Sequence, residues 1–331
     1  MVLSDKSKSS RRKLHFARLG FARLGVLLIL AIIMIPAVTR VSAGKTNPPP
    51  PPPSTGASWI RAYNIPYTYN VAEGVAQASG GGFLIGGLCT AGAVTSPTCG
   101  GPVSEPTATV TRVDSSGNIQ SQTQYVYKSS PGTTRLGLIR ATTDGGSIFT
   151  GNGQFGCPAA GQTSCALIVK VDSNGNVQFA NDLQFSTSCS AGPLTWPLDL
   201  QQTTDGGYVV AGYAYAPACA YNPFVAKLGA TGQLQWQHLF VDPTSQYGAA
   251  LAVRQTPDGG YIIGGELDYY VSASYTASEI LVFKLDPTGT LVWQHDYSIG
   301  TEAYAASLAL TADGGFVVSG SVSISSGIAY S

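Results

Sequence analysis

A ten-residue motif, present in four full copies, constrains the fold of this chain more than any other feature. It reads Thr-x-Asp-Gly-Gly, then three residues that are mostly aromatic or apolar, one variable residue and Gly, and its copies begin at Thr142, Thr203, Thr256 and Thr311. A degenerate copy, Gly80–Gly87, precedes them. The second glycine of the pair stands at positions 82, 146, 207, 260 and 315, so the copies are 53 to 64 residues apart. Self-similarity at such a period is the signature of a repeat architecture.

A second motif lies between the copies of the first. It consists of a basic residue, an apolar residue and Asp-x-x-Gly, and it begins at Arg112, Lys170 and Lys284, while a variant at Lys227 lacks the Asp. Its glycines, at 117, 175, 232 and 289, are 57 or 58 residues apart. Both motifs keep phase over more than 200 residues, so each repeat contains one of each.

Each repeat predicts four β-strands. In residues 248–299, runs rich in Val, Ile and Tyr predict strands at 249–255, 261–266, 280–285 and 290–297. The turns between the first and second strands and between the third and fourth carry Asp at the start and Gly where φ must be positive. Four antiparallel strands per repeat are typical of a propeller blade. We therefore predict an all-β fold, a β-propeller of four-stranded antiparallel blades over residues 57–331.

The two motifs together resemble a known class of repeat. The Asp-Gly-Gly-(Tyr/Phe)-(Val/Ile)-(Val/Ile)-x-Gly block, followed by Lys-x-Asp-x-x-Gly-x-x-x-Trp, resembles the tandem β-propeller repeats of secreted bacterial and archaeal proteins. It is also distantly similar to the quinoprotein-type repeat. That second likeness implies that Trp59, Trp236 and Trp293, which share one register, dock blade to blade. The Asp286-to-Trp293 spacing departs from the quinoprotein motif by one residue and no adjacent Cys-Cys pair is present, so no quinone or other cofactor is expected.

About five blades are predicted. Four full repeats are followed by the first two strands of a fifth. The segment Ser58–Tyr63 matches the fourth-strand position of Val292–Tyr297, so the N-terminal strand can complete the last blade and remove its exposed edge. The alternative is an open, incomplete ring.

The N-terminus predicts export. Residues 6–23 are basic, 26–38 are thirteen uncharged residues, and Val41-Ser42-Ala43 offers small residues to a signal peptidase. We predict a signal peptide at 1–43, with an uncleaved N-terminal anchor as the alternative, followed by a Pro-rich linker at 44–56. Either outcome places the rest outside the cytoplasm, secreted, periplasmic or at the cell surface. Contact with a membrane is expected only through this segment, if it stays uncleaved.

The charge distribution argues against nucleic acid as a partner. Eight of the 18 basic residues but only one of the 18 acidic residues precede position 44. From Gly44 onward, 10 basic residues face 17 acidic ones. A protein that binds nucleic acid neutralises phosphates with clustered Lys and Arg, so nucleic acid is not an expected partner.

The six cysteines predict three disulfides in an exported protein. The repeat frame places Cys89 and Cys99 in one loop, Cys157 and Cys165 in the equivalent loop of the next repeat, and Cys189 and Cys219 in the third repeat. We predict the pairs 89–99, 157–165 and 189–219, with buried free thiols as the alternative. No His lies near them in the chain and none forms a C-x-x-C pair, so no metal site is predicted.

The polar residues of the repeats predict structure rather than chemistry. His238 and His295 occupy one repeat position and are expected on outer strands, and Asp172–Asn176 is expected to be a hairpin turn rather than a calcium loop. The basic residues that open the second motif are expected to be solvated partners of turn Asp residues, with an anion-binding rim as the alternative. No nucleophile elbow and no His-Glu-x-x-His pair is present.

Three insertions depart from the repeat pattern. They span 88–106, 154–165 and 266–279, and they are rich in Tyr, Ser, Thr and Gly, residues common in recognition loops. Tyr269, Tyr270 and Tyr275 form the candidate binding loop. The predicted function is a non-catalytic binding or structural module whose partner is a protein or a glycan. The alternative is an extracellular propeller enzyme, a hydrolase or a quinone-dependent dehydrogenase, and catalysis is the less favoured of the two.

Overall fold

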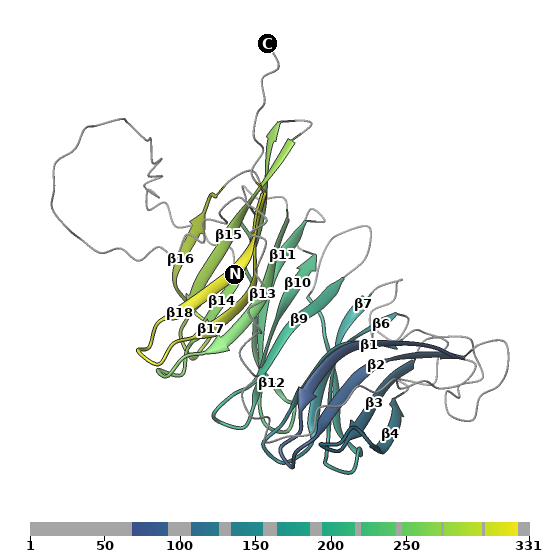
Figure 1. The fold of residues 1–331 in the computed structure, drawn as a ribbon. Helices are drawn as coiled ribbons and strands as arrows, with labels where there is room; N and C mark the ends of the chain where they lie inside the picture. The colour runs from purple at the N-terminus through teal and green to yellow at the C-terminus, as the bar shows by residue number, and fades with distance from the viewer. Residues whose placement is uncertain are drawn as a thin grey trace, which may run out of the picture. The chain divides into compact units, whose positions relative to one another are not determined.

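The chain forms β-strands throughout the part that the structure, a computed structural model, describes (Figure 1). The described residues are 68–91, 107–125, 134–154, 164–185, 194–215, 220–242, 247–272, 275–299 and 302–323. They contain eighteen strands and no helix, and therefore no helix of the length and apolarity that would cross a bilayer. The predicted all-β class is confirmed.

Four repeats of four strands and a fifth of two account for these strands. The first comprises β1 (Thr68–Gln77), β2 (Phe83–Ala91), β3 (Thr107–Val113) and β4 (Ile119–Tyr125). The second comprises β5 (Thr134–Ala141), β6 (Ser147–Gln154), β7 (Ser164–Val171) and β8 (Val177–Leu183). The third comprises β9 (Thr195–Gln202), β10 (Tyr208–Tyr215), β11 (Tyr221–Leu228) and β12 (Leu234–Leu239). The fourth comprises β13 (Tyr247–Gln255), β14 (Tyr261–Ser272), β15 (Tyr275–Leu285) and β16 (Leu291–Tyr297), and the fifth comprises β17 (Glu302–Leu310) and β18 (Phe316–Ser323).

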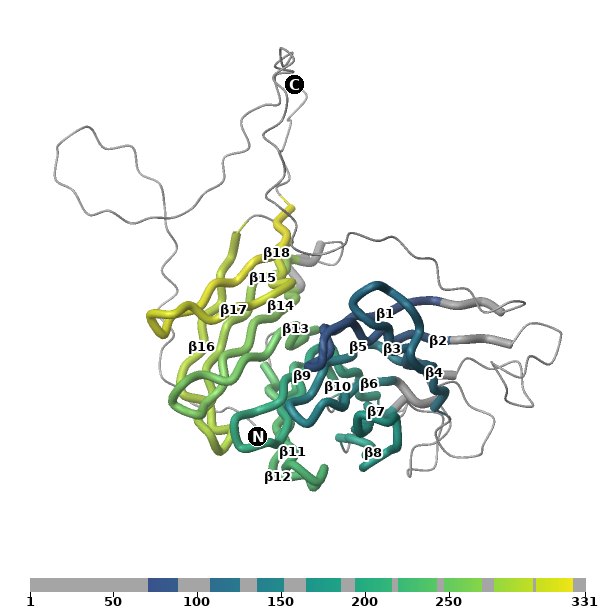
Figure 2. Tube along the Cα trace, turned by 60° about the horizontal axis from the view of Figure 1, so that its bottom comes forward, coloured from purple at the N-terminus to yellow at the C-terminus, as the bar shows by residue number. Residues whose placement is uncertain are grey.

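Within each repeat the strands are antiparallel and pair in chain order. The third and fourth repeats are joined into one eight-stranded sheet by a single parallel bridge between Tyr221 and Tyr247. The first strands of consecutive repeats pack against one another, β1 on β5, β5 on β9, β9 on β13 and β13 on β17 (Figure 2). The fold is therefore propeller-like, with the first strands innermost. No closed ring is found among the described strands, and the segment 58–63, which we expect to close it, lies outside them.

The turn of the first motif explains why its two glycines recur. In the second repeat, Thr142 Oγ1 and Gly146 N donate to Asp144 Oδ1 at 2.6 and 3.1 Å. Gly145 has φ of 83°, which side-chain-bearing residues rarely adopt. A Cβ atom at Gly146 would lie 2.1 Å from the carbonyl oxygen of Val171. The first glycine serves the backbone conformation, and the second serves the close approach of the neighbouring strand.

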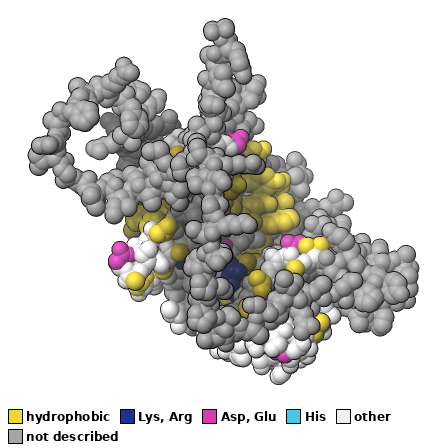
Figure 3. All heavy atoms as spheres, viewed as in Figure 1, with side chains coloured by type: hydrophobic (Ala, Val, Ile, Leu, Met, Phe, Trp, Pro, Cys, Tyr) yellow, Lys and Arg dark blue, Asp and Glu magenta, His cyan; other side chains and the backbone are white. Residues whose placement is uncertain are grey.

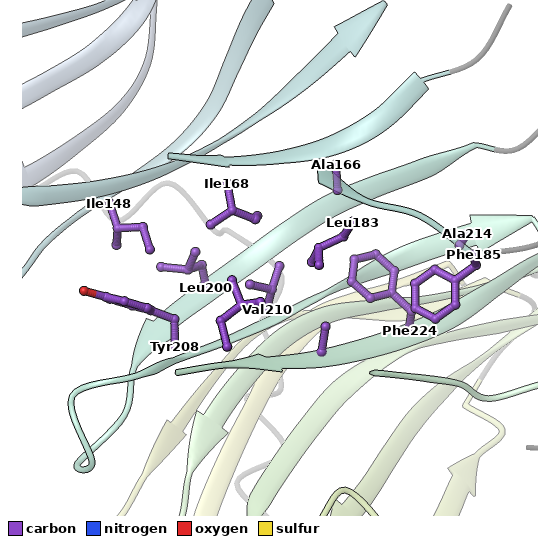
Figure 4. Close-up of a cluster of buried hydrophobic side chains, with 12 residues drawn as sticks. Ile148, Ala166, Ile168, Leu183, Phe185, Leu200, Tyr208, Val210, Ala214 and Phe224 are labelled. Carbon is purple, nitrogen blue, oxygen red and sulfur yellow. The ribbon is translucent and has the colours of Figure 1, made fainter. Parts of the chain in front are cut away.

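The hydrophobic core lies between successive repeats as well as within them. Figure 4 shows Ile148 and Ile168 of the second repeat facing Leu200, Tyr208 and Val210 of the third. All five side chains are at most 2% exposed. Burial of apolar area at about 25 cal/mol per Å² drives such packing. Each repeat is therefore stabilised mainly by its neighbours, as in other repeat proteins.

At three of the four interfaces, an aromatic pair at equivalent repeat positions docks one repeat on the next. The pairs are Phe179–Tyr208, Trp236–Tyr261 and Trp293–Phe316, with ring centroids 5.9, 5.6 and 6.1 Å apart. The docking role predicted for Trp236 and Trp293 is confirmed, while Trp59 lies outside the described residues. At the first interface the two equivalent positions are Ser121 and Ser147. The aromatic pair there is formed at other positions, by Tyr125 and Phe149, with ring centroids 5.1 Å apart.

Several sequence predictions fall outside the described residues. The signal peptide at 1–43 and the linker at 44–56 belong to these, as do the cysteines Cys99, Cys157, Cys189 and Cys219. Cys165 is fully buried on β7, and Cys89 lies on β2. The three disulfide pairs stay predictions.

Candidate functional site

The topology gives each repeat two distinct ends. The turns after the first and third strands lie at one end of each sheet, and the connection between the second and third strands lies at the other, which we call the loop end. The turn ends of neighbouring repeats meet, because Arg112 donates to Gly145 O at 2.9 Å and Gln255 Oε1 accepts from Thr204 N at 2.8 Å. All three insertions follow a second strand, so each belongs to the loop end of its own repeat.

Five aromatic side chains form a continuous series at the loop end of the third and fourth repeats, which we call the aromatic ladder. Its members are Trp196 on β9, Tyr213 and Tyr215 on β10, Tyr221 on β11 and Tyr247 on β13. Trp196 and Tyr213 are nearly parallel, at 5° and 6.3 Å between centroids, and Tyr213 meets Tyr221 edge-on at 5.0 Å. Tyr221 stacks on Tyr215 at 4.7 Å and lies 5.4 Å from Tyr247.

The strand register brings these rings together. Tyr213 and Tyr215 are two positions apart on β10, so both side chains project from the same face of the sheet. Tyr213 pairs with Trp196 across β10 and β9, and Tyr215 pairs with Tyr221 across β10 and β11. Tyr221 in turn forms the single bridge with Tyr247 of the next repeat. Directly opposed aromatic residues are among the stabilising cross-strand pairs of β-sheets.

The aromatic ladder is accessible and uncharged. Tyr247 is 39% exposed, and the other four side chains are partly exposed. Burial raises the pKa of Tyr213, and the hydrogen bond with Tyr215, whose hydroxyl lies 3.1 Å away, raises the pKa of Tyr221. Both phenols therefore stay neutral at physiological pH. Figure 3 shows a continuous hydrophobic area near the middle of the face in view.

A cavity of about 180 Å³ adjoins the ladder. It is lined by apolar residues from both repeats together with the polar side chains of Asp242 and Gln294. Two of its lining residues are close in register to the aromatic ladder. Pro223 pairs with Tyr213 across β10 and β11. Leu267 directly precedes Asp268, which pairs with Tyr247 across β13 and β14.

Asp296 and Tyr269, in the same repeat as part of the cavity lining, both have a raised pKa. Burial raises the pKa of Asp296, and the charge of Asp242 raises it further, against a hydrogen bond from Gln294 at 3.1 Å. Burial also raises the pKa of Tyr269, and the carboxylates of Asp242, Asp296 and Glu279 add to the effect. Asp296 is thus more readily protonated than an ordinary Asp side chain, and Tyr269 remains a phenol.

The insertion 266–279 was predicted to form a loop, and this prediction is wrong because its described residues lie on two paired strands. β14 continues to Ser272 and β15 begins at Tyr275, so the insertion extends a hairpin in which Tyr270 pairs with Thr276. Tyr, Val and Thr favour the extended pleated backbone, so the added residues lengthen both strands equally. Tyr269 is partly buried against the core of the fourth repeat. The side chains of Tyr270 and Tyr275 lie outside the described residues.

Sequence reasoning missed the aromatic ladder because it examined insertions rather than strand ends. The available signal was the alternation of Tyr213 and Tyr215 just beyond the first motif of the third repeat, a position at which the second repeat has Asn152 and Gln154. Tyr221 begins the next strand of the same repeat. The contribution of Tyr247, from another repeat, had no local signal.

The basic residues of the second motif pair with the Asp of the first motif in the same repeat. Lys170, Lys227 and Lys284 each lie 2.8 or 2.9 Å from a carboxylate oxygen, of Asp144, Asp205 and Asp258 respectively. The pairing with turn Asp residues is confirmed for these three lysines, whereas Arg112 donates to Gly145 O at 2.9 Å. The solvated state is wrong for two of them, because the side chains of Lys170 and Lys227 are only 2% and 3% exposed. Their ammonium groups are engaged, so they do not form an anion-binding rim.

The remaining polar predictions have structural outcomes. Asp172 Oδ1 accepts from Asn174 N and Asn176 N at 2.8 Å each, the geometry of a hairpin turn. His238 and His295 lie on β12 and β16, the fourth strands, where each packs beside a Trp. Within the described ranges, no group of three or more His, Cys, Asp or Glu is arranged to hold a metal ion.

Comparison with known proteins finds structural neighbours only at low sequence identity. No family model and no curated protein matches the chain. Among solved structures, a protein of unknown function from Dyadobacter fermentans is 13% identical with a TM-score of 0.45, and the match covers 78% of this chain and 76% of that one. A mannose phosphorylase from Leishmania mexicana is 9% identical with a TM-score of 0.40, covering 78% and 82%. A puromycin hydrolase is 13% identical with a TM-score of 0.44, covering 78% and 38%.

Proposed function

We propose that this protein is an exported β-propeller that binds glycans outside the cytoplasm through the aromatic ladder. The five repeats serve as its blades, and the loop end of the third and fourth repeats is its binding surface. The observation that carries the proposal is the unbroken contact of five partly exposed aromatic rings across two repeats. Such an accessible aromatic series is not needed for repeat packing, which the docking pairs and the buried core supply.

The chemistry of the ladder suits a sugar. The face of an aromatic ring carries partial negative charge and attracts the weakly positive C–H groups on one side of a pyranose ring. The paired hydroxyls of Tyr215 and Tyr221 offer hydrogen bonds at the edge of the stacked rings. Asp242 and Gln294 in the adjoining cavity accept and donate hydrogen bonds to sugar hydroxyls. Apolar faces combined with a few placed polar groups are the general pattern of ligand sites.

The export signal in the sequence supports an extracytoplasmic location for this activity. An exported protein meets polysaccharides of envelopes and surroundings, while the acidic excess after Gly44 disfavours polyanionic nucleic acids. Tandem propeller repeats of this type resemble those of secreted prokaryotic proteins, where the scaffold serves many uses.

The test is a glycan microarray probed with the full chain and three variants. Tyr247→Ala and Tyr213→Ala each remove one ring of the ladder, and Tyr304→Ala removes a single tyrosine of β17 that is 43% exposed and serves as the matched control. We expect wild type and the control to retain the same glycans and both ladder variants to lose at least ten-fold in affinity. Circular dichroism confirms that the variants are folded.

Two outcomes contradict the proposal. One is that no glycan is retained by the wild type. The other is that folded Tyr247→Ala and Tyr213→Ala proteins retain the same glycans as the wild type.

A second candidate function is glycoside hydrolysis, favoured by the carboxyl pair of Asp242 and Asp296. Hydrolysis of glycosidic bonds uses one protonated and one ionised carboxyl group. The raised pKa of Asp296 favours its protonated form, the form that a general acid requires. Release of reducing ends from a bound glycan, abolished by both Asp296→Asn and Asp242→Asn, would establish it. Binding without release under the same conditions leaves the binding function alone.

A further inference from the structure

Three charged side chains from three consecutive repeats meet on the innermost strands. Asp199 on β9 lies between Arg140 on β5 and Arg254 on β13. Arg140 Nη2 donates to Asp199 Oδ1 at 2.9 Å, and Arg254 Nη1 donates to Asp199 Oδ2 at 2.5 Å. We call these three residues the Arg–Asp–Arg cluster.

The cluster departs from the repeat pattern. Counted from the Thr that opens the first motif, the residues equivalent to Asp199 are Leu138 in the second repeat, Ala252 in the fourth and Ser307 in the fifth. The fold therefore does not require a carboxylate at this position. A feature that occurs once in a repeated scaffold is a candidate for function, because a binding site is needed once.

Asp199 is fully engaged by protein donors. Its side chain is 5% exposed, and besides the two guanidinium groups it accepts from the backbone N–H groups of Leu200 at 2.9 Å and Val253 at 3.0 Å. Four donors satisfy both oxygens of a carboxylate. A buried carboxylate with this many partners fixes the positions of the two arginines.

The two arginines are not fully engaged. Arg140 is 38% exposed and Arg254 is 27% exposed in their side chains. Each donates to Asp199 and to the backbone carbonyl of the residue before it, Ile139 O or Val253 O. A guanidinium group has five N–H donors, so about three on each remain without an acceptor among the described residues. The cluster carries one net positive charge.

We propose that Arg140 and Arg254 form an anion-binding site on the innermost strands, with Asp199 as the residue that positions them. The ligand is an oxyanion with at least two acceptor oxygens, a sulfate, a phosphate or a carboxylate, borne by a larger ligand or free. Planar guanidinium groups bind such anions through paired N–H donors, and a fixed orientation reduces the entropy lost on binding. This site is separate from the aromatic ladder and does not rest on glycan binding.

A purely structural cluster and a binding site differ in their response to anions. If the three residues only join the repeats, substitution lowers stability and no anion binds. If they also form a site, an oxyanion binds in the presence of excess chloride, and the arginines determine its affinity. Measurement of binding itself separates the two, whereas stability alone does not.

The experiment is isothermal titration calorimetry of the full chain with sulfate, phosphate and acetate in separate runs, at constant ionic strength set by chloride. The variants are Arg140→Lys and Arg254→Lys, which keep the charge but lose the planar fork. Lys284→Gln removes one positive charge at a turn and is the control for overall charge. Asp199→Asn removes the carboxylate that positions the two arginines.

We expect wild type and Lys284→Gln to bind at least one of the three anions equally, and the two Arg→Lys variants to bind it at least ten-fold more weakly. We expect folded Asp199→Asn to bind it more weakly than wild type, because the two arginines lose the carboxylate that positions them. The anion that binds identifies the ligand group. Absence of binding to all three anions by the wild type overturns the proposal, as does equal binding by both Arg→Lys variants.

Discussion

The ammonium group of Lys227 lies 2.9 Å from a carboxylate oxygen of Asp205, which precedes it by 22 positions. Lys227 is the second-to-last residue of β11 and Asp205 belongs to the turn that precedes β10, so the pair ties the third strand of the repeat to the turn between the first two. Lys227 also donates to Leu228 O at 3.0 Å. These two acceptors compensate for the burial of the ammonium group, and burial of the charge without the carboxylate would destabilise the fold.

Replacement of Asp205 by Asn should destabilise the third repeat. Lys227 would keep its buried position but lose its counter-ion, and we expect a loss of about 2 kcal/mol in the free energy of unfolding, reduced by the half-exposed position of Asp205. Asp258→Asn is the matched control, because its partner Lys284 is 14% exposed and better hydrated. Urea unfolding should show the larger loss for Asp205→Asn. Equal losses would contradict the role of burial.

Acid should destabilise the fold between about pH 4 and pH 2. Burial opposes ionisation of Asp144 and Asp205, but hydrogen bonds from Lys170 and Lys227 and from turn groups outweigh it and lower each pKa to about 2. A carboxyl group whose pKa is lower in the folded state stabilises it above the ordinary value near 4, and this contribution disappears as pH falls through 2.

Thermal unfolding at pH 5, 4, 3 and 2 tests the contribution of these two groups. The Asp144→Asn, Asp205→Asn double variant should start less stable and lose less between pH 4 and pH 2 than wild type. A double variant whose acid dependence matches that of wild type would show that other groups determine it.

Loss of a docking ring should lower the free energy of unfolding more than loss of the serine at the equivalent position of the first interface. Trp236→Ala removes the ring that packs edge-on against Tyr261, and we expect it to cost about 2 kcal/mol, since the Trp is partly exposed. Ser121→Ala changes the equivalent position at the first interface, which carries an exposed serine in place of a docking ring, and should cost less than about 0.5 kcal/mol. Chemical denaturation measures both. Similar costs for the two variants would refute the assignment of this position as a docking position.

Reduction should destabilise the first three repeats. The predicted disulfides 89–99, 157–165 and 189–219 close short loops, and each contributes about 2–3 kcal/mol in the loop-entropy description. Peptide mapping without reductant, on protein made under oxidising conditions, should recover these three pairs. Free thiols at any of the six positions would count against the pairing.

The repeats made most of the fold predictable from the sequence. Four strands of the fourth repeat were expected at 249–255, 261–266, 280–285 and 290–297, and they lie at 247–255, 261–272, 275–285 and 291–297. The turn residues set these boundaries, because Asp and Gly have strong local conformational preferences. The extension of β14 and β15 was not foreseen, since Tyr and Ser residues in an insertion suit a loop as well as a lengthened hairpin.

The candidate site was less predictable because its residues come from several strands. Tyr221 and Tyr247 meet only through a bridge between repeats, and the sequence around each shows no sign of the other. Asp199 was readable as a departure from the repeat pattern, but its partners Arg140 and Arg254 are 59 and 55 positions away. Register between repeats, rather than local pattern, decides both arrangements.

The fluorescence of Trp196 tests the central claim most directly. A glycan that stacks on the aromatic ladder must change the surroundings of Trp196 but not those of Trp293, which packs on Phe316 of the fifth repeat. Titration of a retained glycan into wild type and Trp293→Phe should give the same saturable change in emission, and Trp196→Phe should give none. An undiminished change in folded Trp196→Phe, or none in wild type while the glycan binds, would place the binding surface elsewhere.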